Sequence, residues 1–214
     1  MMRLGLALIA AVPAALFAAA PALASADHAP RDVVEVINAD WTRDAVLYQL
    51  NTRQFTAEGT FAAAQTQLPR LAKMGIDIIW LMPIHPIGEL NRKGSLGSPY
   101  AVRDYRAVNP DFGSEADFRA FVDEAHRLGM KVILDWVANH SAFDNPLTQS
   151  HPEWYTLSPE GALMSPVGTD WSDVADFDYS QPGLRRYMTE SLTFWVREFG
   201  VDGYRADVAG YVPL

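Results

Sequence analysis

One pattern occurs three times in this chain and limits the folds open to it: a helix with a basic residue in its last turn, a glycine, and a short apolar run. The glycines are Gly75, Gly129 and Gly200. A glycine directly after a helix favours the left-handed residue that ends it, and a basic side chain there suits the helix dipole. Ser114 and Asp117 have the spacing of a capping box at the start of the second helix. We expect helices over residues 61–74, 114–128 and 182–199.

The apolar run after each glycine has the length of a β-strand. With one earlier run, these segments predict strands over residues 46–50, 76–83, 130–135 and 201–207. Nearly continuous apolar strands that alternate with helices are typical of a parallel sheet covered by helices. The sequence therefore indicates the α/β class.

Two long segments follow predicted strands, at 83–113 and 137–181, and both are rich in Gly, Pro, Asn, Asp and aromatic residues. Loops at the carboxyl ends of parallel strands are where α/β proteins carry their functional residues. We expect the site in these segments, and the second is long enough to form a small inserted subdomain.

Composition excludes several classes of partner. The chain has 214 residues, of which 49% are hydrophobic, a net charge of −9, and no cysteine. Because it has no basic stripe, nucleic acid and anionic membrane surfaces are not expected partners. A cysteine nucleophile and a cysteine-bound metal are excluded.

The N-terminus has the pattern of a secretory signal peptide over residues 1–26. A short start with Arg3 precedes an apolar run over 4–20, and Ala24-Ser25-Ala26 has the form of a cleavage site. The alternatives are a membrane anchor or a buried helix, but Pro13 and Pro21 interrupt a run already short for a bilayer. We expect a secreted or periplasmic protein, residues 27–214, with no membrane partner after cleavage.

Residues 203–207 read Gly-Tyr-Arg-Ala-Asp and place two charged side chains at the end of a strand. Arg205 and Asp207 are two residues apart, so their side chains point the same way. A guanidinium beside a carboxylate keeps that carboxylate ionised, and an ionised Asp at this position is a candidate covalent nucleophile. The alternative is a structural ion pair at the rim of a barrel.

A second polar cluster, Asp135, Asn139 and His140, follows the strand predicted over 130–135. An acid, an amide and an imidazole at one strand end can position hydroxyls, hold a metal, or tune a neighbouring carboxylate. Taken singly, the histidine would be an ordinary loop residue and the asparagine a turn residue.

Together these motifs carry a resemblance. Residues 135–140 and 203–207 resemble the third and fourth signature strands of the α-amylase family of glycoside hydrolases, while 46–49 and 75–83 resemble its first two strands. The likeness covers residues 44–212. It implies the first four βα units of a (β/α)8 TIM-type barrel with a short insertion after strand 3, which places a partial catalytic barrel at 27–214 and an inserted subdomain at 137–181.

The resemblance also implies roles for single residues. Asp207 matches the nucleophile that forms a glycosyl-enzyme, and Arg205 the arginine that keeps it ionised. For substrate binding, Asp135 matches the acid at the end of strand three, His140 the histidine that binds a sugar hydroxyl, and Tyr100 the aromatic residue that stacks on the sugar. Tyr100 taken alone would be a core or rim tyrosine.

The resemblance also implies a calcium site, and it implies no organic cofactor. Asn139 matches one calcium ligand and Asp176 resembles the ligand from the insertion, and oxygen donors of this kind suit calcium. Gly210 and Tyr211 replace the Lys-His pair that often follows the nucleophile strand, and this departure weakens the expectation of a metal.

The implied function is that of a secreted retaining hydrolase of α-glucans or malto-oligosaccharides. The family takes its acid/base Glu from strand five, and no Glu follows Asp207. We therefore expect the N-terminal part of such an enzyme, inactive alone. The alternatives are an α-glucan transglycosylase, a non-catalytic carbohydrate-binding or partner subunit, and an unrelated barrel enzyme with a metal held by Asp135, Asn139 and Asp207.

Overall fold

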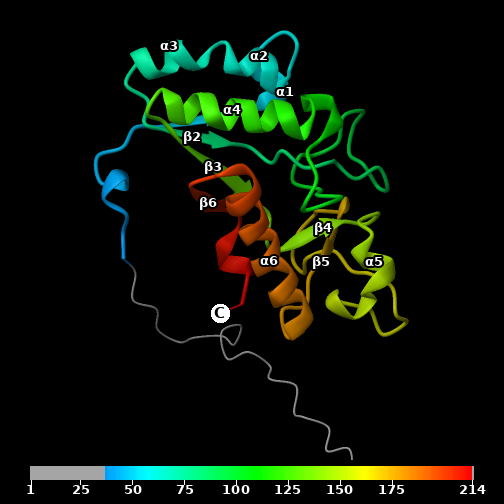
Figure 1. Ribbon diagram of the computed structural model, residues 1–214. Helices are drawn as coiled ribbons and strands as arrows, with labels where there is room; N and C mark the ends of the chain where they lie inside the picture. The colour runs from blue at the N-terminus through cyan, green and yellow to red at the C-terminus, as the bar shows by residue number, and fades with distance from the viewer. Residues whose placement is uncertain (1–36, 214) are drawn as a thin grey trace, which may run out of the picture.

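The computed structural model describes residues 37–213 as one parallel sheet flanked by helices, with a small two-stranded sheet beside it (Figure 1). The four parallel strands lie in the order β1-β2-β3-β6. The signal peptide expected over 1–26 lies outside the described residues. The predicted first four βα units of a barrel are confirmed.

The elements follow the predicted alternation. The strands are β1 (Leu47–Leu50), β2 (Ile78–Leu81), β3 (Lys131–Trp136), β4 (His140–Ala142), β5 (Val174–Asp176) and β6 (Gly203–Ala206). The helices are α1 (Thr52–Phe55), α2 (Phe61–Gln65), α3 (Leu68–Lys73), α4 (Glu115–Arg127), α5 (Leu147–Ser150) and α6 (Pro182–Phe199). Four 3₁₀ turns complete the described part, η2 (Asp40–Thr42), η3 (Pro110–Phe112), η4 (Pro152–Trp154) and η5 (Ala209–Tyr211).

Two of the three predicted helices, those over 114–128 and 182–199, form as single helices. The capping box of α4 is present, with the Ser114 and Asp117 side chains each bonded to the backbone of the other residue. The prediction of one helix over 61–74 is wrong, because the chain forms α2 and α3 instead. Pro69, in the first turn of α3, has no N–H for the carbonyl of Gln65, and its ring would clash with that carbonyl in a continuous helix.

The starts of β2 and β6 are tied to their neighbours by aspartates. Asp77 Oδ2 accepts a hydrogen bond of 2.8 Å from the Val46 amide, and Asp202 Oδ2 accepts one of 2.9 Å from the Val132 amide. Each aspartate stands two residues after a helix-ending glycine with positive φ, Gly75 or Gly200. This arrangement fixes strand register at the amino ends, and therefore where the carboxyl ends meet.

The two faces of the parallel sheet are used differently. Ile79, Leu81 and Val132 are buried in the core that the helices cover, as is Leu134. Trp80, which alternates with this set, points to the opposite face and is only half-buried. The face of the sheet that the helices do not cover, to which Trp80 points, therefore carries the polar groups of the candidate site described below.

The segment between β3 and α6 forms the insertion. Its strands β4 and β5 pair antiparallel, with His140 opposite Asp176. The loop after β2 packs against it, since the Ala142 amide donates to the Val102 carbonyl over 2.9 Å. The short insertion predicted after strand 3 is confirmed.

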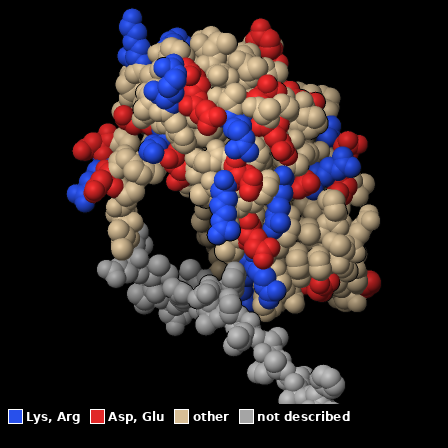
Figure 2. Space-filling view, in the orientation of Figure 1, with Lys and Arg blue, Asp and Glu red and all other residues tan. Residues whose placement is uncertain are grey.

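Charges of both signs are interspersed on the face shown in Figure 2, over α4 and α6, and no broad basic area appears there. Within residues 37–213, no helix is both long and apolar enough to span a bilayer.

Candidate active site

The carboxyl ends of β3 and β6 meet at an arginine that bridges two carboxylates. The strands pair with Asp135 opposite Arg205. Arg205 Nη1 lies 3.0 Å from Asp135 Oδ1 and 2.6 Å from Asp207 Oδ1. The pairing of Arg205 with Asp207 expected from the sequence is present, and the contact with Asp135 adds a second anchor to the guanidinium.

Asp135 is the buried centre of this network. Its side chain is fully buried, and Oδ2 also accepts hydrogen bonds from Trp80 Nε1 at 3.1 Å and from the Tyr100 hydroxyl at 3.2 Å. Burial raises the pKa of the Asp135 carboxyl above its ordinary value, while the Arg205 guanidinium opposes that shift. Asp135 does not line the pocket described below, so its substrate contact stays a prediction.

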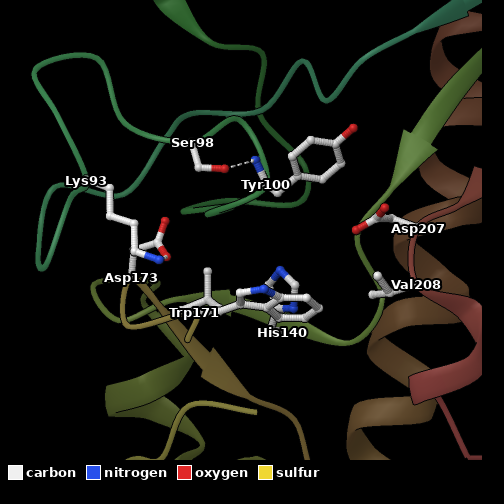
Figure 3. Close-up of a pocket in the computed structure, with 9 residues that line it drawn as sticks. Lys93, Ser98, Tyr100, His140, Trp171, Asp173, Asp207 and Val208 are labelled. Carbon is white, nitrogen blue, oxygen red and sulfur yellow. Dashed lines mark hydrogen bonds and ion pairs between the residues drawn. The ribbon is translucent and has the colours of Figure 1, made fainter. Parts of the chain in front are cut away.

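Beside this network lies a pocket of about 340 Å³. Asp207, Tyr100 and His140 all line it, although they come from three separate segments of the chain (Figure 3). Its volume falls in the range of small-molecule sites, about 300–1,000 Å³. The lining is completed by Lys93, Ser98, Trp171, Asp173, Val174 and Val208.

Asp207 follows β6 directly, and its amide continues the ladder by donating to the Trp136 carbonyl over 2.9 Å. Arg205 occupies Oδ1, whereas Oδ2 accepts no hydrogen bond from residues 37–213. The next residue, Val208, has φ 40° and ψ 43°, a left-handed conformation that is costly for a β-branched side chain. The turn bends the chain sharply after the carboxylate and leaves one oxygen open to the pocket.

His140 is nearly buried and neutral at physiological pH. Burial lowers the pKa of its imidazole to about 4, against the pull of the Asp207 and Asp173 charges. A neutral imidazole has one donor and one acceptor nitrogen, which suits a sugar hydroxyl. The Tyr105 hydroxyl lies 2.6 Å from the His140 carbonyl oxygen and 2.8 Å from that of Val137, so its single proton is shared between two carbonyls of the surrounding backbone.

Tyr100 presents its ring to the pocket while its hydroxyl bonds to Asp135. Burial, with the Asp135 carboxylate beside it, raises the pKa of Tyr100 to about 12. The hydroxyl therefore stays protonated and can donate to Asp135, so the orientation of the ring is fixed.

Several site residues were missed by the sequence reasoning. Trp80 donates a hydrogen bond to Asp135, and the Arg205 guanidinium lies 5.0 Å from the Trp80 ring. The sequence signal that could have identified Trp80 is a single tryptophan in an otherwise aliphatic strand. Trp171 packs edge-on against His140 at 5.4 Å. No local motif marked this tryptophan, nor Lys93 and Asp173.

Asn139 and Asp176 lie at the base of the insertion. The Asn139 carbonyl oxygen accepts a hydrogen bond of 3.1 Å from the amide of Phe177, the residue after Asp176. Asn139 and Asp176 therefore lie at neighbouring ends of β4 and β5. Their amide and carboxylate oxygens suit calcium, but Asp176 Oδ2 already accepts the Thr156 hydroxyl at 2.7 Å. Within 37–213, no group of three or more His, Cys, Asp or Glu side chains could hold a metal ion. Any calcium here would need carbonyl and water ligands as well.

Comparison with known proteins gives the family. The family model of the alpha-amylase catalytic domain matches residues 35–159 and 167–213. The chain belongs to the alpha-amylase family. The resemblance inferred from the strand motifs is thus confirmed.

Solved structures of the family share this fold. An alpha-amylase from Lactobacillus plantarum is 50% identical with a TM-score of 0.76, over 79% of this chain and 39% of that structure. A maltogenic alpha-amylase from Thermotoga neapolitana is 46% identical with a TM-score of 0.74, over 79% of this chain and 40% of that structure.

A curated relative is a transferase. The alpha-1,4-glucan:maltose-1-phosphate maltosyltransferase of Mycolicibacterium smegmatis is 37% identical over 167 residues, which are 70% of this chain and 24% of the relative. The chain therefore spans about a quarter of that relative and about two fifths of the two amylase structures. The alpha-amylase family relatives include both glycosidases and glycosyltransferases.

Proposed function

We propose that this chain supplies the nucleophile and part of the sugar-binding pocket of a secreted retaining enzyme that acts on α-glucans. The observation that carries the proposal is the bridge from Arg205 to both Asp135 and Asp207, beside a pocket that Asp207 lines. A structural ion pair alone would not need the second carboxylate to face a pocket with one oxygen unbonded.

In the proposed reaction, Asp207 Oδ2 attacks the anomeric carbon and the bond to the glycosidic oxygen breaks, which forms a glycosyl-enzyme ester. The departing oxygen takes a proton from a second carboxylic acid, which in retaining enzymes lies about 5–5.5 Å from the nucleophile. No glutamate lines the pocket within the described residues, and the one other carboxylate of the lining, Asp173, is paired with Lys93 across the pocket from Asp207. The acid/base group is therefore expected from another part of the enzyme.

Tyr100 and His140 would hold the reacting sugar. Aromatic rings stack on the apolar face of a pyranose, and the rigid phenol of Tyr100 is available for that contact. The neutral His140 imidazole would bind a hydroxyl without adding a positive charge next to Asp207. A cation there would repel the positive charge that develops in the oxocarbenium-like transition state.

The test is the substitution Asp207→Asn in the full-length gene product. Hydrolysis of soluble starch should fall by at least about 10³-fold while glucan binding is largely kept, because the loss falls on the transition state. Glu190→Gln is the control, since Glu190 on α6 pairs with Arg106 and does not line the pocket. Near-normal turnover of Asp207→Asn would refute the nucleophile assignment.

A transglycosylase is the second candidate, favoured by the relationship to a maltosyltransferase. Chromatography of products from maltotetraose separates the two, since a transferase also yields chains longer than the substrate. A non-catalytic subunit is less well supported, because Arg205 and Asp207 are both in place. The metal-dependent alternative conflicts with the network around Asp135, whose oxygens are taken by Arg205, Trp80 and Tyr100.

Calcium at Asn139 and Asp176 is proposed as a stabilising ligand with no step in the reaction. A ligand that binds only the native state raises its stability. Removal with EGTA should lower the melting temperature, and the drop should vanish in Asp176→Asn. An identical melting curve with chelator and with added calcium would remove both residues from the metal site.

A further inference from the structure

At the end of the pocket opposite Asp207 stands an ion pair with no role in the reaction described above. Lys93 Nζ, from the loop after β2, lies 3.3 Å from Asp173 Oδ1 in the insertion. It also donates to the Asp170 carbonyl over 2.9 Å. Figure 3 shows this pair across the pocket from Asp207, with Trp171 and His140 between.

The pair is unusual because of its burial. The Asp173 side chain is only 8% exposed, whereas Lys93 is 49% exposed. Within residues 37–213, Lys93 is the one cation in contact with this carboxylate, and Asp173 Oδ2 accepts no hydrogen bond. Although most of the Asp173 side chain is buried, Oδ2 is not one of the buried atoms that lack a partner, so it keeps some contact with solvent. Because Asp173 lines the pocket, this oxygen is free to accept a hydrogen bond from a ligand there.

We propose that Lys93 and Asp173 together bind the hydroxyl groups of a neutral glucosyl unit next to the one that Asp207 attacks, and so determine the length of chain that the site accepts. This inference rests on the proposed function. An ammonium and a carboxylate side by side offer a donor and an acceptor, which matches hydroxyls that both donate and accept. Trp171, between this pair and His140, gives the sugar an apolar surface.

The charges of the lining favour a neutral sugar over a phosphorylated one at this end. Lys93 is the one Lys or Arg side chain of the lining, and two carboxylates, Asp173 and Asp207, accompany it. A phosphate group would meet Asp173 beside the only ammonium, and like charges at that distance repel.

The chain offers a matched control for the test. Arg103 also belongs to the loop after β2 and also contacts an aspartate of the insertion, with Nε 3.7 Å from Asp144 Oδ2, but neither residue lines the pocket. Lys93→Met and Arg103→Met therefore each remove one bridge between the same two segments. Only the first removes a group from the pocket.

The experiment measures binding by calorimetry in the full-length gene product carrying Asp207→Asn, with glucose, maltose, maltotriose and maltose 1-phosphate. Lys93→Met and Asp173→Asn should weaken maltotriose binding about 10–100-fold, the usual loss for hydrogen bonds to charged groups, and leave glucose binding unchanged. Arg103→Met should change neither. Melting curves of each variant show that the fold is kept.

Three outcomes would overturn the proposal. Unchanged maltotriose affinity in both pocket variants excludes a contact with the sugar. Equal losses in Lys93→Met and Arg103→Met mean that the pair only joins two segments. Tighter binding of maltose 1-phosphate than of maltose, lost in Lys93→Met, assigns a phosphate to the pair. Failure of the proposed function is distinguished by a separate measurement: starch hydrolysis would then be absent from the wild type or would persist in Asp207→Asn.

Discussion

Arg205 joins three functional groups through one planar cation. Its guanidinium contacts Asp135 and Asp207 and lies over the ring of Trp80. Both carboxylates accept from the same nitrogen, Nη1, whose two N–H bonds point in fixed directions in the guanidinium plane. A lysine ammonium on its flexible stem does not hold its donors in that plane. The orientation of Asp207, the proposed nucleophile, therefore depends on Arg205 in addition to its charge.

The substitution Arg205→Lys tests that conclusion. The positive charge is kept, but the planar Nη1 donor that holds both carboxylates is lost, so kcat on maltotriose should fall about 10–100-fold with little change in KM. Arg127→Lys is the matched control, because it alters an exposed guanidinium–carboxylate pair with Glu124 on α4. If both variants retain normal kcat, charge alone suffices at position 205.

Residues within one contiguous motif could be predicted, whereas partners brought together by the fold could not. The spacing of Arg205 and Asp207 is local, so their contact follows from strand geometry. Trp80 and Asp135 are 55 residues apart in sequence, and their contact depends on the pairing of β2 with β3. The same holds for Lys93 and Asp173, which are joined only by packing of a loop on the insertion.

At the level of elements, the repeated helix–glycine–strand pattern was sufficient to predict the alternation of strands and helices along the chain and a parallel sheet, whereas the order of the strands in the sheet came from the family resemblance. The break between α2 and α3 was missed because the Ala-rich composition of 61–74 outweighed Pro69. The aspartates at the strand starts were also missed, since nothing local shows that Asp202 reaches the amide of Val132 on another strand.

Asp202 should contribute measurably to stability. Its carboxylate accepts Lys131 Nζ at 2.8 Å and the Val132 amide at 2.9 Å, and it contacts His126 Nε2 at 2.7 Å. Asp202→Asn should lower the free energy of unfolding by about 1–3 kcal/mol at pH 7, measured by urea denaturation. The exposed Asp123→Asn on α4 is the control and should change it by less than about 0.5 kcal/mol.

The effect has a defined pH dependence. Burial alone would raise the pKa of Asp202, but hydrogen bonds from Lys131, the Val132 amide and His126 hold it below its ordinary value. A carboxyl with a depressed pKa stabilises the fold above its unfolded pKa, near 4, and loses that contribution as pH falls through the folded value. The difference between wild type and Asp202→Asn should therefore shrink below about pH 4, and a constant difference would contradict the assignment.

For the whole molecule, the edges of the sheet matter most. Within residues 37–213, β1 and β6 each pair with one neighbour only, and Leu47 of β1 remains 45% exposed. Unpaired strand edges are templates for association. The other strands of a barrel would cover both edges.

Residues 27–214 expressed alone should therefore associate and should not hydrolyse starch. Size-exclusion chromatography with light scattering measures the first property, and a reducing-sugar assay the second. A cooperatively melting monomer would show that the edges are protected by other means. Turnover that depends on Asp207 would show that this part of the chain contains its own proton donor.

The pairing of β4 with β5 has a consequence for how such enzymes diversify. Because His140 and Asp176 face each other across this pair, the insertion leaves and rejoins the barrel at one narrow base. It contributes His140, Trp171 and Asp173 to the pocket but no strand to the parallel sheet. Exchange of the insertion between relatives would replace one wall of the pocket in a single step. The strands that carry Asp135, Arg205 and Asp207 would stay unchanged.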